Sequence, residues 1–195
     1  IAVSLAALTQ LAVLMCLILF LIGGVVYNMP PWRLKQRPYW DILVESINNP
    51  LRFIAGAITI GPLGWHSISL AGMVWLLGLW VLTLKRYAEM QCLGVALAKQ
   101  YRAVFSYYNS NMLWKVALFL LGLLSILLFF LLWETVAAWV FMLWPLFLLL
   151  LLYYQRLAQA PHSKAQQPEA LYRTHPLFLS LVLIVLVIYV ALLWL

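Results

Sequence analysis

The chain has 195 residues, of which 67% are hydrophobic and only 9% are charged, and its formal net charge is +7. A soluble domain has about 45–50% apolar and about 25% charged residues, so this composition excludes a soluble globular domain and indicates a protein embedded in lipid. The positive charge does not indicate a nucleic-acid-binding protein. The cations flank long apolar runs, where they suit anionic lipid head groups or an anionic substrate.

The apolar runs predict an all-α, polytopic membrane helix bundle that forms a single transmembrane domain over residues 1–195. Because the sequence does not begin with Met and ends inside an apolar run, we interpret it as a fragment of a longer chain. Six spans are expected in chain order: 3–26, 51–64, 68–84, two within 113–154, and 177–195.

Two of these runs differ in length or composition from a single apolar crossing. The run 113–154 is too long for one crossing of about 20 residues, so it predicts a helical hairpin that turns near residues 133–135. The run 51–64 contains Arg52 and Pro62. It predicts a short or broken helix whose backbone is shielded by neighbouring helices.

The basic residues divide the connections into two kinds. All twelve Lys and Arg residues lie in or beside the loops 27–52, 85–115 and 154–173, whereas the connections near 62–69 and 133–138 contain none. Loops on the cytoplasmic side of membrane proteins carry an excess of Lys and Arg. The three basic loops are therefore predicted to face the cytoplasm.

The cytoplasmic loops are predicted to have structure of their own. Pro30 and Pro31 stop the helix after Met29 and favour an extended segment. Residues 41–48 predict a short helix at the membrane interface. The spread of charges through 84–108 predicts a helix-turn-helix that caps the mouth of the bundle.

The first candidate site is the basic run after the double proline. Arg33, Lys35 and Arg37 stand at alternate positions, and alternate residues of an extended segment point the same way. They form one row that can face an anion, and the arginine fork matches phosphate oxygens. The alternative is an ordinary cytoplasmic anchor beside a membrane span.

The second candidate site is the sequence Lys85-Arg86-Tyr87-Ala88-Glu89. Lys85 and Glu89 are spaced i,i+4 on a helix, which favours an ion pair between them and a self-paired helix end. The functional interpretation is that Lys85 and Arg86 contact phosphate and that Glu89 is an acid or a metal ligand.

Acidic residues are few, and three of them lie in the basic loops. Asp41 and Glu45 are spaced i,i+4 and are expected to share one face of a short helix. Glu89 lies in the next basic loop. A magnesium–diphosphate site needs one or two carboxylates in addition to phosphate oxygens, and these three acids are on the side that suits it.

Residues 27–35, with the sequence YNMPPWRLK, resemble the Tyr-Ser-x-Pro-Pro-x-Arg-Leu-Lys segment that follows the fourth helix of UbiA-type intramembrane prenyltransferases. The order of later features is also similar. A short span follows Asn49-Pro50-Leu51-Arg52, and then come another span, a long cytoplasmic loop and three further helices. The resemblance covers the whole chain, which would correspond to helices four to nine of a nine-helix bundle.

The resemblance implies a mechanism and a set of site residues. Magnesium held by two Asp-rich cytoplasmic loops would bind a polyprenyl diphosphate, whose isoprenyl group would pass to an acceptor. In this chain the place of the second Asp-rich motif is residues 85–89, which contain no Asp. Glu89 and, less directly, Asp41 are the expected catalytic acids and metal ligands. The expected phosphate-binding and mouth-lining residues are Arg33, Lys35, Arg37, Lys85, Arg86, Tyr27 and Asn28.

The sequence is therefore compatible with two functions. The first is an integral-membrane prenyltransferase that uses a polyprenyl diphosphate or phosphate. The second is a non-catalytic membrane subunit of similar fold that binds lipid, quinone or pigment, or packs within a larger complex; the missing Asp motif favours it. Membrane lipids are expected neighbours in both cases, and nucleic acid in neither.

Overall fold

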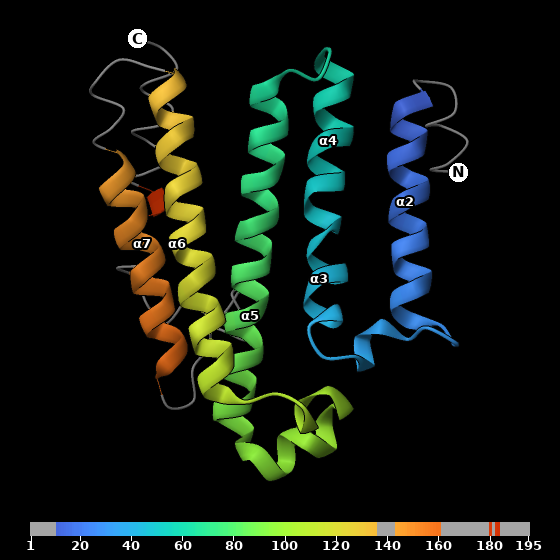
Figure 1. The fold of residues 1–195 in the computed structure, drawn as a ribbon, viewed down its shortest axis with the longest axis vertical. Helices are drawn as coiled ribbons and strands as arrows, with labels where there is room; N and C mark the ends of the chain where they lie inside the picture. Colours follow the sequence, from blue (N-terminus) through green and yellow to red (C-terminus); the bar gives the residue numbers. More distant parts are fainter. Residues whose placement is uncertain (1–10, 136–142, 161–179, 181, 184–195) are drawn as a thin grey trace.

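The computed structural model describes residues 11–135, 143–160, 180, 182 and 183 (Figure 1). In this part of the chain every regular element is helical, which confirms the all-α class. In chain order the elements are α2 (Leu11–Asn28), η1 (Leu34–Gln36), α3 (Trp40–Ser46), α4 (Asn48–Ile60), α5 (Trp65–Tyr101), η2 (Ala103–Ser106), α6 (Ser110–Thr135) and α7 (Leu143–Gln159).

Within the described residues, three helical stretches are long and apolar enough to cross a membrane: Leu11–Asn28, Trp65–Gly94 and Ser110–Leu131. They coincide with the first, third and fourth predicted spans and support a membrane protein. As the hairpin prediction requires, α6 and α7 pack against each other as antiparallel neighbours (Figure 1). The turn was expected near residues 133–135, but these residues still belong to α6. The predicted last span, 177–195, lies almost entirely outside the described residues, so the total of six spans stays a prediction.

The predicted second span, residues 51–64, corresponds largely to α4, and α4 continues the line of α3. At 13 residues, α4 reaches about 20 Å, which is less than the hydrocarbon core of about 30 Å. However, α3 and α4 lie in line (Figure 1). They are separated only by Ile47, whose φ of −64° and ψ of −18° are helical. Together they make a nearly continuous rod instead of an isolated short span and a separate surface helix.

The helices stand side by side in sequence order from α2 to α7 (Figure 1). The main core lies between α5, α6 and α7. Its fully buried alanines, Ala88, Ala117 and Ala158, let the helix backbones approach closely, as small residues do in membrane bundles. Helix α2 has Cys16 as its only buried residue and α4 has none, and the two helices pack against each other.

Polar contacts hold the α3–α4 rod against α5. A Cβ atom on Gly78 would lie 2.4 Å from Nδ2 of Asn49, so a larger residue at this point would force the Asn49 amide to move. Trp75 donates a hydrogen bond from Nε1 to Oγ of buried Ser46, at 3.0 Å. These contacts fix how α3 is presented to the lower half of α5.

The last turns of α5, after Gly94, bend back over the end of the bundle where α3 lies. Gly94 has a φ of +70° and interrupts the helix, a conformation that glycine adopts without the strain a Cβ atom would cause. The chain then returns through η2, and buried Val104, Phe105 and Tyr108 pack near Ile42 of α3. The predicted helix-turn-helix is confirmed in this form.

Candidate functional site

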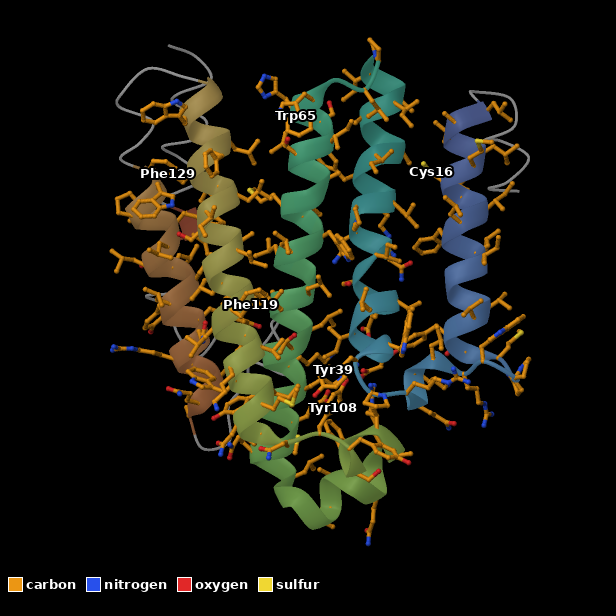
Figure 2. The ribbon with its side chains drawn as sticks, in the orientation of Figure 1. Cys16, Tyr39, Trp65, Tyr108, Phe119 and Phe129 are labelled. Atoms are coloured by element: carbon orange, nitrogen blue, oxygen red, sulfur yellow. The ribbon has the colours of Figure 1, made fainter. Side chains whose placement is uncertain are left out.

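All the segments with predicted site residues meet at one end of the bundle, the lower end in Figure 2. There the connection after α2 contacts α3, and α3 and η2 both contact α5. A groove of about 510 Å³ lies at the other end of α4, lined by Ala12 and residues 58–63. That lining contains no charged residue, so a site that binds an anionic group is expected at the lower end of the bundle instead.

Arg86 lies at the centre of this end and is 1% exposed. Its Nε atom donates to Oδ2 of Asp41 at 3.0 Å, and its Nη2 atom donates to Oε2 of Glu45 at 3.0 Å. Its Nη1 atom lies 3.2 and 3.4 Å from the two carboxylate oxygens of Glu89. We call Arg86, Asp41, Glu45 and Glu89 the inner cluster.

Helix periodicity builds this arrangement. Asp41 and Glu45 lie one turn apart on α3 and reach the same guanidinium, which confirms that they share a helix face. Arg86 and Glu89 are spaced i,i+3 on α5. The predicted pairing of Lys85 with Glu89 is wrong, because Glu89 pairs with Arg86. The planar guanidinium presents donors along its edges, so it serves three carboxylates at once.

Asp41 is fully buried and has a second partner in Tyr108. The Tyr108 hydroxyl donates to Oδ1 of Asp41 and accepts a 2.8 Å hydrogen bond from the backbone N–H of Tyr39. Figure 2 shows Tyr39 and Tyr108 close together, and their rings meet edge to face at 5.3 Å. Burial raises the pKa of the Tyr108 phenol far above its usual value, and the adjacent Asp41 carboxylate acts in the same direction. Tyr108 is therefore a fixed neutral donor.

Glu45 connects the inner cluster to α2 and to solvent. Its Oε2 atom accepts a 3.0 Å hydrogen bond from the Tyr27 hydroxyl as well as the one from Arg86. The Glu45 side chain is 35% exposed, whereas those of Asp41 and Glu89 are buried. The inner cluster is therefore closed at Asp41, Arg86 and Glu89 and partly open at Glu45.

The predicted row of three cations does not form as expected. Residues Leu34–Gln36 make a 3₁₀ turn, and Arg33 adopts the left-handed conformation with φ 38°. The extended segment was therefore a wrong prediction, although the Pro30–Pro31 pair does end α2 and has a cis peptide bond. We call residues 33–37 the basic loop.

The basic loop presents its charges outward. Arg33 and Arg37 are exposed, and Lys35 is half-buried and donates from Nζ to Oδ1 of Asn28 at 3.3 Å. Within the described residues none of these three cations forms an ion pair, and neither does half-buried Lys85 on α5. Phosphate can thus reach these cations without displacing a carboxylate of the described chain, whereas Arg86 is already engaged.

The expected magnesium ion does not fit the acids of the inner cluster as they are arranged. Asp41 and Glu89, the expected ligands, direct carboxylate oxygens at Arg86. In the described part of the chain, no three His, Cys, Asp or Glu side chains are placed to hold a metal ion.

Tyr108 and Tyr39 were not identified from the sequence. Tyr108 lies 67 residues from Asp41, and neither tyrosine belongs to a motif or to a helical spacing with an acid. The only local sign is that Tyr108 directly precedes Asn109 and Ser110, where α6 begins. Tyr108 contacts Asp41 because the chain turns back toward α3 after Gly94.

No protein-family model, curated protein or solved structure matches this chain. Membership of the UbiA-type family is therefore a prediction that rests on the sequence resemblance of residues 27–35 and on the order of the later segments.

Proposed function

We propose that this protein is a UbiA-like intramembrane prenyltransferase that binds a polyprenyl diphosphate or phosphate at the lower end of the bundle, on the cytoplasmic side. The observation that carries the proposal is a set of cations there that form no ion pair with the described residues. Arg33 and Arg37 lie exposed on the basic loop, and Lys85 lies one residue from Arg86, which contacts α3. The loop also contacts α3.

The physical argument combines an anionic head group with an apolar tail. Phosphate oxygens form strong charge-assisted hydrogen bonds with Arg and Lys, and departing negative charge is stabilised by donors already in place. The apolar helices exclude water from a reactive allylic group, and aromatic faces stabilise positive charge. These properties suit transfer of an isoprenyl group to an acceptor.

The residues divide into two roles in this proposal. Arg33, Lys35, Arg37 and Lys85 hold phosphate, with Tyr27 and Asn28 at the edge of the mouth. Asp41 and Glu89 stay the proposed catalytic acids, and Arg86 orients both of them.

The test is a transfer assay on the full-length protein in membranes, with radiolabelled isoprenyl diphosphates and a membrane extract as the source of acceptor. Arg33→Ala should weaken binding of the diphosphate and reduce product formation. Arg156→Ala, which removes an exposed cation from α7, is the matched control and should behave like the wild type. Unchanged affinity and turnover in Arg33→Ala would exclude the assigned role of Arg33.

A second function is favoured by one observation. The acids that the transferase needs are all bonded to Arg86, which suits a non-catalytic subunit that retains the fold to bind lipid, quinone or pigment. Mass spectrometry of molecules that copurify with the protein separates the two. A bound isoprenoid or pigment, together with no transfer by an intact preparation, would support the subunit.

A further inference from the structure

The inner cluster places one cation among three carboxylates in a buried site, which is the composition expected around a bound divalent ion. We propose that the guanidinium of Arg86 takes the place of that ion, so that Asp41, Glu45 and Glu89 bind a tethered organic cation and no metal. This inference goes beyond the proposed function and does not depend on it.

The contacts of Arg86 support this assignment directly. Each of its three side-chain nitrogens is directed at a different carboxylate: Nε at Asp41, Nη2 at Glu45 and Nη1 at Glu89, with N–O distances of 3.0, 3.0 and 3.2 Å. A magnesium ion would instead require oxygens converging at about 2.0–2.1 Å in octahedral geometry. The carboxylates are spread around the edge of a planar group, which suits guanidinium.

Both oxygens of Asp41 and of Glu89, and Oε2 of Glu45, have hydrogen-bond donors without a metal. The Tyr108 hydroxyl donates to the second oxygen of Asp41, and both oxygens of Glu89 lie near Nη1. Glu45 receives a hydrogen bond from Tyr27 in addition to the one from Arg86. Two neutral phenols thus help one cation to stabilise three acids, as buried charged groups require.

Burial gives a further argument. Magnesium gives up water reluctantly and usually keeps several water ligands. The side chains of Arg86, Asp41 and Glu89 are 1%, 0% and 8% exposed, so a hydrated ion has no open approach past these three side chains. Glu45 is the open side, and its contacting oxygen is already shared by two donors.

The experiment counts metal ions on the purified full-length protein by Mn²⁺ titration with electron paramagnetic resonance detection. Any metal site elsewhere in the protein contributes equally to all variants, so differences between variants report on the inner cluster. Glu45→Gln and Glu89→Gln should bind as many ions as the wild type. The loss of one ion in either variant would overturn the proposal.

Arg86→Ala provides the complementary test, because it removes the tethered cation and leaves three acids. This variant should gain one Mn²⁺ ion relative to the wild type, and the gain should disappear in Arg86→Ala/Glu89→Gln. Its melting temperature should fall and then rise on addition of Mn²⁺. Arg52→Ala removes an exposed arginine that lies over the ring of Phe20 and should show neither change.

Whether or not Arg86→Ala folds, one of the two tests can contradict the proposal. If Arg86→Ala folds but gains neither an ion nor Mn²⁺-dependent stability, the cluster is only an ion-pair network and the proposal fails. If Arg86→Ala does not fold, the comparison of the wild type with Glu45→Gln and Glu89→Gln still decides. Since no isoprenyl substrate is present, failure of the transferase proposal leaves this result unaffected.

Discussion

The inner cluster and the basic loop lie at the same end of the molecule and both contain arginine, yet their arginines are organised in opposite ways. In the inner cluster Arg86 is buried and bonded to three carboxylates. In the basic loop, Arg33 and Arg37 are exposed and form no ion pair with the described residues. The acids of the inner cluster are thus paired with a buried cation, whereas the arginines of the basic loop are left exposed.

Dielectric surroundings explain the difference. A charge buried among helices is tolerated only when it is paired and hydrogen-bonded, so Arg86 needs the acids of α3. A charge at the rim stays hydrated, and a surface ion pair would stabilise the protein by only about 0–1 kcal/mol. The basic loop therefore has little to gain from internal pairing. We expect stability to depend on the inner cluster and anion binding to depend on the basic loop.

The largest effect is expected for Arg86→Met. Removing one partner from a buried ion pair costs about 3–5 kcal/mol, because the remaining charges lose their partner. Reversible unfolding in mixed micelles measures the loss, and Arg52→Met is the control, for which a cation–π contact predicts about 0.5–1 kcal/mol. Similar losses in the two variants would remove the distinction between buried and exposed arginines.

The next effect is expected for Tyr108→Phe. This change leaves one oxygen of buried Asp41 without its donor, and a buried unsatisfied group costs about 1–3 kcal/mol. The same unfolding measurement applies. Tyr107→Phe, at an exposed neighbouring position, is the control and should behave like the wild type; a loss equal to that of Tyr108→Phe would contradict the assigned contact.

A smaller effect on stability, but a large effect on binding, is expected when Arg33, Lys35 and Arg37 are all changed to Gln. Surface substitutions usually change stability by within about 0.5 kcal/mol, whereas a hydrogen bond to a charged group contributes about 1.5–3 kcal/mol. Isothermal titration with an isoprenyl diphosphate should therefore show at least about tenfold weaker binding. Lys115→Gln/Arg156→Gln is the control at exposed positions. Loss of stability without loss of binding would reverse the two roles.

The smallest effect concerns pH. The pKa of Tyr108 is raised on folding, so its stabilising contribution is complete below the unfolded value of about 10 and decreases as the pH rises above it. The difference in melting temperature between the wild type and Tyr108→Phe should therefore shrink above about pH 10. A difference that grows at alkaline pH would show that Tyr108 ionises readily and is not the neutral donor to Asp41.

Part of the site could be predicted because it depends on local spacing. Asp41 and Glu45 lie one helical turn apart, and their shared face follows from periodicity alone. The break of α2 before the basic loop follows from Pro30 and Pro31. The extended row of Arg33, Lys35 and Arg37 was wrong, because a 3₁₀ turn at Leu34–Gln36 depends on how buried Leu34 packs, which alternation in the sequence does not reveal.

By itself, the sequence determined the helical class, the apolar stretches able to cross a membrane and the position of the charges between them, because these depend on composition and periodicity. Only the tertiary structure decided which charges are used internally. Arg86 and Asp41 are 45 residues apart, and they meet because Gly78 and Asn49 let α5 approach the α3–α4 rod closely. Pairing over such a distance follows from packing geometry and the need to neutralise buried charge.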